Sequence, residues 1–164
     1  MHFTSALALL SVAAVVSADQ IRSNTNGLCL DVPDGVNGPN KIRLTDCCKA
    51  KHSNWTIVAN PKNVNEVMIR HTEGITDNNN NGWCVDHYPD RTGPNPTLWE
   101  CNYEFSQYFT RDPNTVLGAD SFVKRNKLHE LAVLPGDGAN SLANFGPIEP
   151  ATAKRVHFEW TIVK

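Results

Sequence analysis

A carboxylate and an aromatic ring lie close to two cysteines in the middle of this chain. Asp86 follows Cys84 by two positions, and Trp99 precedes Cys101 by two. Side chains two positions apart on a strand point to the same face, so a Cys84–Cys101 bond would draw Asp86 and Trp99 together. A carboxylate replaces water at vicinal hydroxyls through charge-assisted hydrogen bonds, and a flat ring covers apolar C–H groups. The chemistry available to this pair is the binding of a neutral sugar.

These residues belong to a pattern that recurs along the chain. Its landmarks are GLCLD at 27–31 with GWCVD at 82–86, LTDC at 44–47 with LWEC at 98–101, and aromatic-centred segments at Trp55, Phe109 and Trp160. The aromatic landmarks are 54 and then 51 residues apart. A fixed period in several landmarks indicates tandem units that share a core. We therefore expect three units, at residues 19–65, 66–115 and 116–164, with the three aromatic residues inside the shared core.

Short runs rich in β-branched and aromatic residues alternate with turns in all three units. Turn residues are dense between the runs, as in the stretches at 33–40, 78–82, 92–96 and 135–138. No window of 11 or more residues after the first 18 has a convincing helical period, which favours an all-β domain. About four strands in each unit predict a closed threefold barrel, because closure removes exposed sheet edges.

The first residues are predicted to direct the chain out of the cell. The segment Ala6–Val16 is apolar and ends in Val16-Ser17-Ala18, the small-x-small pattern of a signal-peptidase site. It is shorter than the ~20 residues that span a bilayer, and a buried N-terminal helix is the alternative. We expect a signal peptide at residues 1–18, a single domain at 19–164, and a secreted, extracellular protein.

Charge and motifs argue against several classes of function. The formal net charge is −2 and the basic residues are scattered, which disfavours nucleic acid and anionic membranes as partners. The segment Asp77–Gly82 begins like a calcium loop, but the twelfth position is Tyr88 where a glutamate is required. The six histidines show no ligand spacing, and no acid–base pair or nucleophile motif is present. We expect no enzyme activity, no metal, no cofactor and no membrane insertion.

The order and threefold spacing of these landmarks resemble the ricin-type lectin domain family, whose repeats carry a Q-x-W motif. The resemblance covers residues 19–164, strongly in the first two units and weakly in the third. Of the three aromatic landmarks, one keeps its glutamine, Gln107, and there Phe109 replaces the tryptophan. The resemblance implies a β-trefoil of about twelve short strands that binds glycans or glycoproteins.

The resemblance also implies which residues form a sugar pocket. The family uses the aspartate after the first cysteine, the aromatic residue before the second and a polar residue in the Q-x-W segment, here Asp86, Trp99 and Gln107. Ser106 stands where the family often has asparagine. A galactose-type sugar, weakly bound, is the expected ligand. The competing interpretation makes Trp99 a half-buried strand residue and Asp86 the cap of a turn.

The other two units are predicted to be poorer sites. Asp31 provides a carboxylate in the first unit, but Thr45 stands where the aromatic residue belongs, and His52-Ser53 replaces the polar pair. In the third unit, alignment of LAV at 131–133 with LDV places Ala132 at the aspartate position. That alignment puts Glu130 where the cysteine belongs, and Phe145 is expected in the core. The third unit is therefore expected to close the barrel and to bind nothing.

Five cysteines lie in the first two units. In a secreted chain, cysteines at matched positions indicate a disulfide framework. The repeat alignment predicts Cys29–Cys47 and Cys84–Cys101, with Cys29–Cys48 as an alternative. The odd residue, Cys48, is expected to be a buried free thiol or another partner for Cys29.

One N-glycosylation sequon is present, Asn54-Trp55-Thr56. Strand alternation turns Asn54 outward if Trp55 is buried, so modification of Asn54 is expected where the host supports it. Two functions compete for the whole chain. The first is a lectin. The alternative is a β-trefoil with decayed sugar sites that acts by protein contact, for example as a protease inhibitor or a host-interaction factor.

Overall fold

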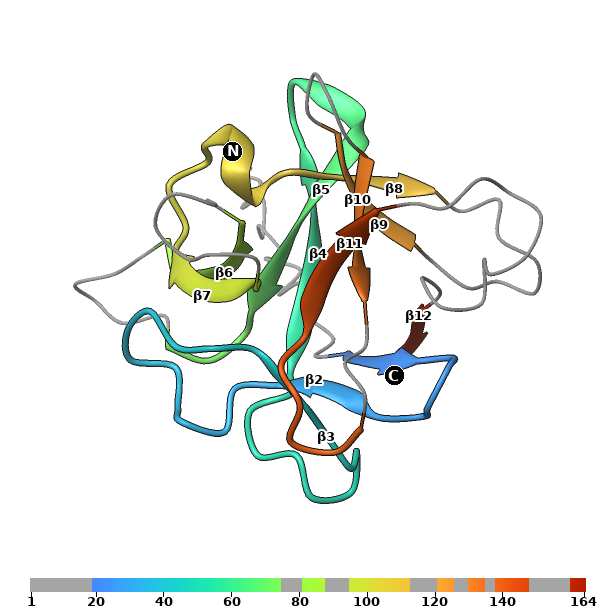
Figure 1. Cartoon of the computed structure of the whole chain (residues 1–164). Helices are drawn as coiled ribbons and strands as arrows, with labels where there is room; N and C mark the ends of the chain where they lie inside the picture. Colours follow the sequence, from blue (N-terminus) through green and yellow to red (C-terminus); the bar gives the residue numbers. More distant parts are fainter. Residues whose placement is uncertain are drawn as a thin grey trace, which may run out of the picture.

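The computed structural model describes residues 19–74, 81–87, 95–112, 121–125, 130–134, 138–147 and 160–164 (Figure 1). Within these ranges lie strands and a single 3-10 helix, and no α-helix. The strands are β1 (Gln20–Ser23), β2 (Cys29–Asp31), β3 (Arg43–Thr45), β4 (Trp55–Asn60), β5 (Asn63–His71), β6 (Trp83–Asp86), β7 (Thr97–Glu100), β8 (Phe109–Asp112), β9 (Ser121–Arg125), β10 (Glu130–Leu134), β11 (Asn144–Pro147) and β12 (Trp160–Val163), with the 3-10 helix η1 at Phe105–Gln107. The predicted signal peptide at residues 1–18 lies outside the described residues.

The pattern of strand pairing repeats three times along the chain. In each of three groups of strands, a barrel strand pairs with the first strand of a hairpin. The groups are β1–β2–β3, β5–β6–β7 and β9–β10–β11. The barrel strands pair as β12 with β1, β4 with β5, β5 with β8, and β8 with β9. A bridge between Asp19 and Trp55 joins the residue before β1 to β4. This is the arrangement of a β-trefoil, which confirms the predicted fold. Strand β5 begins at Asn63, before the boundary expected at residue 66.

The hairpins meet one another at one end of the barrel. Lys41, just before β3, bridges to Thr97 at the start of β7, and Arg43 in β3 bridges to Leu142 before β11. The Asn95 amide donates to the Ala143 carbonyl at 3.0 Å. Because each hairpin edge is covered by a neighbour, the end of the barrel is closed.

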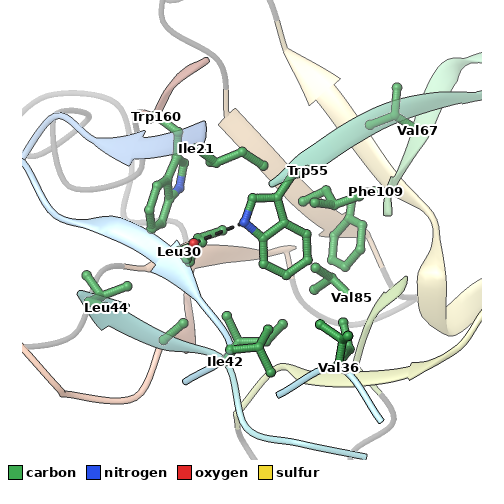
Figure 2. Close-up of a cluster of buried hydrophobic side chains, with 14 residues drawn as sticks. Ile21, Leu30, Val36, Ile42, Leu44, Trp55, Val67, Val85, Phe109 and Trp160 are labelled. Carbon is green, nitrogen blue, oxygen red and sulfur yellow. Dashed lines mark hydrogen bonds between the residues drawn. The ribbon is translucent and has the colours of Figure 1, made fainter. Parts of the chain in front are cut away.

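The three aromatic landmarks lie in one buried cluster, as predicted. Trp55, Phe109 and Trp160 are fully buried and converge from different units (Figure 2). The indole N–H of Trp55 donates to the Leu30 carbonyl at 3.0 Å, so this ring both fills the core and satisfies a buried hairpin carbonyl. Large rings of this kind contribute about 3–5 kcal/mol against truncation.

The backbone register aligns the three units with one another. Each core aromatic faces one residue of a barrel strand; these partners are His71 for Trp55, Ser23 for Trp160 and, on continuing the β8–β9 ladder by one residue, Lys124 for Phe109. The residue before each partner faces the next hairpin; these pairs are Arg70 with Cys84, Arg22 with Cys29 and Val123 with Ala132. Ala132 therefore occupies the cysteine position of the third unit.

This register corrects the sequence alignment of the third unit. Leu134, two residues after Ala132, takes the position of Asp31 and Asp86, so the placement of Ala132 there was wrong by two residues, as was that of Glu130. A shift of two preserves the face on which each side chain lies. Apolar residues alone therefore could not fix the alignment once the cysteines and the aspartate were lost. The third unit still lacks the carboxylate, because leucine stands in its place.

Candidate functional site

The hairpin β6–β7 brings together the residues singled out in the second unit. Cys84 faces Trp99 across the hairpin, and Asp86 faces Thr97. All four side chains lie on one face. Half-buried Trp99 is two residues along the hairpin from the Asp86–Thr97 pair. The predicted Cys84–Cys101 disulfide is present and fixes the open end of the hairpin.

Asp86 is held by two side chains from the helix η1. The Ser106 hydroxyl and the Gln107 amide both donate to the Asp86 Oδ2 atom, each at 3.0 Å. Asp86 is 4% exposed, so the carboxylate is fixed inside the protein and not displayed on a flexible surface. Charge-assisted bonds of this kind are roughly twice as strong as neutral ones.

Gln107 acts by positioning Asp86. Its second amide hydrogen goes to the Glu100 carbonyl at 2.8 Å, and its Oε1 atom accepts the Asn102 N–H at 2.9 Å. A glutamine amide has two N–H donors, and both are used here. Gln107 is fully buried, and its contacts are with Asp86 and the backbone, so its part in sugar binding stays a prediction.

Two polar atoms at this end of the hairpin have no hydrogen-bond partner among the residues that the structure describes. These are the second carboxylate oxygen of Asp86, Oδ1, and the hydroxyl of Thr97, both buried. Thr97 is 7% exposed and faces Asp86 directly in the register. A buried polar atom without a partner costs about 1–3 kcal/mol, which a ligand hydroxyl would relieve. Sequence reasoning missed Thr97, although its position two residues before Trp99 places it on the same face.

The matching carboxylate of the first unit is arranged differently. Asp31 is buried, and its Oδ1 atom accepts the backbone N–H of His52 at 2.8 Å. Arg43 faces Asp31 where Thr97 faces Asp86, and Thr45 faces Cys29 at the position of Trp99. Asp31 is not among the residues left with an unpaired buried atom. The hairpin of the first unit thus has the carboxylate without the ring, and its unpaired buried atom among the described residues is the Thr45 hydroxyl and not a carboxylate oxygen.

In the first unit, a glutamine from another strand contacts the serine that stands at the position of Gln107, and no bond from it to Asp31 is found among the described residues. The Gln20 amide, from β1, donates to the Ser53 hydroxyl at 3.0 Å and to the Cys47 carbonyl at 3.3 Å. Ser53 occupies the position of Gln107, two residues before the core aromatic. Sequence reasoning missed Gln20 because it lies far from the third landmark of its own unit. The predicted Cys29–Cys47 disulfide is present beside it.

A histidine pair and a glutamate lie next to the first unit's hairpin. The His52 Nδ1 atom is 2.7 Å from the Glu73 Oε2 atom. His71 is fully buried, its Nδ1 atom accepts the Glu73 N–H at 3.1 Å, and its Nε2 atom lies 3.0 Å from the His52 carbonyl. The imidazole is therefore the neutral form with its proton on Nε2. Burial lowers the pKa of His71 from its ordinary value.

Two predictions about the first unit have different outcomes. Cys48 is free, as expected, but it is exposed, so the expectation of a buried thiol was wrong. The cause is the turn at residues 47–49, which carries the chain away from the core immediately after Cys47. Asn54 is half-buried and its amide donates to the Glu73 Oε1 atom at 3.3 Å. Its glycosylation stays a prediction.

No group of three or more histidine, cysteine, aspartate or glutamate side chains suited to a metal is found among the described residues. No helix within the same residues is long and apolar enough to cross a membrane.

No protein-family model matches this sequence. No curated protein matches it either. Among solved structures, a designed threefold-symmetric protein, ThreeFoil, is similar at a TM-score of 0.67 and 11% identity, over 90% of this chain and 99% of its own. A mosquitocidal holotoxin is similar at a TM-score of 0.71 and 15% identity, over 93% of this chain and 18% of its own. A proteinase inhibitor from Coprinopsis cinerea is similar at a TM-score of 0.65 and 13% identity, over 90% of this chain and 97% of its own. At such identities the likeness shows the β-trefoil fold alone.

Proposed function

We propose that this chain is a secreted lectin of the ricin type that binds a galactose-type sugar through its second unit, without enzyme activity. The observation that carries the proposal is the state of Asp86. One carboxylate oxygen is fixed by Ser106 and Gln107, while the other is buried without a partner opposite the unpaired Thr97 hydroxyl. A carboxylate so held is preorganised for a donor that the described part of the chain does not supply.

A pyranose offers what this site lacks. One sugar hydroxyl donates to Asp86 Oδ1, and an adjacent hydroxyl pairs with the Thr97 hydroxyl. The ring of Trp99, on the same face of the hairpin, covers the C–H side of the sugar. Such a site has one stacking ring and few hydrogen bonds, so we expect a dissociation constant of about 0.1–1 mM.

The disulfides support the proposed location. Cys29–Cys47 and Cys84–Cys101 fit an extracellular protein, since such bonds persist in oxidising compartments. Expression in a secreting host, followed by sequencing of the N-terminus, tests this part of the proposal. A mature protein that begins at Asp19 is expected, and retention of an uncleaved protein inside the cell would contradict it.

A glycan array tests the function itself. We expect the secreted protein to bind galactose-terminated glycans, Asp86→Asn to bind none, and the matched variant Asp31→Asn to bind like the parent. Circular dichroism of each variant checks the fold. A parent protein that binds no glycan in a broad set would contradict the proposal and favour action by protein contact.

A further inference from the structure

Two aromatic side chains are exposed beside the candidate site, on the loop between β7 and the end of η1. Phe105 is 69% exposed and Tyr103 is 50% exposed. Among the described residues, Val64 is the other large apolar side chain that is similarly exposed. Large aromatic rings are usually buried for most of their surface, and a gathering of exposed ones marks a surface that binds something.

This loop is tied directly to Asp86. The Asn102 side chain accepts the Glu104 N–H at 3.1 Å, and the Asn102 N–H donates to the Gln107 side chain at 2.9 Å. Gln107 in turn holds Asp86. The two rings are therefore on a fixed segment next to the carboxylate, and a ligand that stacks on them loses little free energy to ordering.

The backbone of Tyr103 adds an independent observation. Its φ angle is 59°, in the left-handed region that residues with a side chain rarely adopt. Glycine or asparagine would fit there with less strain. Strained residues of this kind cluster at ligand-binding segments, and here the strain is kept together with an exposed aromatic ring.

We propose that Tyr103 and Phe105, with Glu104 between them, form a second subsite that takes the next ring of a glycan whose terminal sugar occupies the Asp86 site. The inference rests on the proposed function and extends it from a single sugar to an oligosaccharide. Flat rings cover the C–H face of a pyranose, and the exposed Glu104 carboxylate accepts its hydroxyls. Ser106 and Gln107 join the two subsites, because they are the next two residues after Phe105 and both donate to Asp86.

The size and charge of the subsite favour a sugar over larger partners. Two aromatic rings bury about 150–250 Å² each, well below the ~800 Å² per partner of a stable protein interface. Glu104 lies between Tyr103 and Phe105 in the sequence, and the chain carries a net charge of −2. Both negative charges oppose an anionic membrane surface. A pyranose needs neither a large interface nor positive charge.

Binding of galactose and of lactose, its disaccharide with glucose, tests the subsite. Calorimetry compares the parent with the double variant Tyr103→Asn, Phe105→Ala, in which asparagine tolerates the left-handed backbone. Val64→Ala is the matched control, since it removes exposed apolar surface elsewhere. We expect the parent to bind lactose about tenfold more tightly than galactose. In the double variant lactose affinity falls to that of galactose, galactose affinity is unchanged, and Val64→Ala behaves like the parent.

Three results would separate the failures. Equal affinity for the two sugars in the parent, or a double variant that loses both sugars alike, would overturn the subsite and leave the Asp86 site standing. Lactose binding that survives Asp86→Asn but not the double variant would contradict the proposed function and support the subsite. A parent that binds neither sugar would overturn both.

Discussion

The hairpins of the first and second units share a scaffold but differ in the hydrogen bonds of their aspartate carboxylates. Each has a disulfide, a buried aspartate two residues after the first cysteine, and a glutamine amide that fixes the neighbouring segment. In the first unit the Asp31 carboxylate accepts a backbone N–H. In the second, the Asp86 carboxylate keeps one buried oxygen without a partner. Under the proposed function, stability and sugar binding are therefore carried by different atoms of the same framework.

The difference begins at a few positions. Gln107 donates to Asp86 from the segment before the core aromatic. Ser53, at the same position of the first unit, has a shorter side chain and accepts a hydrogen bond from Gln20 in β1. Thr97 and Trp99 in β7 correspond to Arg43 and Thr45 in β3. A site of this kind is thus lost by changes that leave the fold intact.

The largest expected effect compares two core aromatics. Trp55→Ala and Phe109→Ala should each lower the free energy of unfolding by about 3–5 kcal/mol, because both rings are fully buried. Trp55→Phe should cost about 1–3 kcal/mol, since it leaves the Leu30 carbonyl without its donor. Urea denaturation measures all three. A harmless Trp55→Phe would show that the indole bond does not distinguish the two units.

The disulfides should contribute equally in the two units. Their sequence separations are 18 and 17, and loops of this size stabilise by roughly 3 kcal/mol in the chain-entropy model. The variants are Cys29→Ala with Cys47→Ala, and Cys84→Ala with Cys101→Ala. Denaturation should give matching losses, whereas sugar affinity should fall only in the second pair. Lost binding in the first pair would break the assignment of function to one unit.

The two glutamines should behave alike in stability and differently in binding. Gln107→Leu and Gln20→Leu each remove two donated bonds inside the protein, so each should cost about 1–3 kcal/mol. Only Gln107→Leu should weaken sugar binding, because Gln107 donates to Asp86 and Gln20 does not donate to Asp31. Thermal unfolding and sugar titration of both variants provide the measurements. Equal losses of sugar affinity would argue that the effect is global loosening.

The smallest effect is a pH dependence at the junction of the first two units. Burial lowers the pKa of His71 in the folded protein, so the unfolded chain binds a proton that the folded chain resists. The stability due to neutral His71 is complete above the unfolded pKa of about 6.5 and falls as the pH drops toward the folded value. Denaturation between pH 7.5 and 5.5 should show a steeper loss for the parent than for His71→Gln. Parallel curves would contradict this.

The fold was predictable because its signals repeat. The aromatic residues at 55, 109 and 160 and the paired cysteines have a common period, and large rings and disulfides tolerate few other arrangements. The alignment of the third unit failed because apolar residues alternating with period two look the same after a shift of two. Leu134 could be placed only once backbone pairing was known.

The candidate site was predictable in part. Asp86 and Trp99 could be selected by their spacing from the cysteines. Other features of the site depend on which donors reach which acceptors. These are the unpaired Thr97 hydroxyl, the bond from Gln20 to Ser53 and the positioning role of Gln107. Those contacts join residues from separate strands, and no local pattern in the sequence encodes them.

The most direct test uses the two glutamine side chains as probes within one molecule. Galactose is titrated into isotope-labelled protein while the side-chain amide signals of Gln107 and Gln20 are followed by NMR. We expect the signal of the Gln107 amide, which donates to Asp86, to shift with a dissociation constant of about 0.1–1 mM. The signal of the Gln20 amide should not shift. A Gln107 signal that does not shift at saturating galactose, or equal shifts of both signals, would contradict a sugar site confined to the second unit.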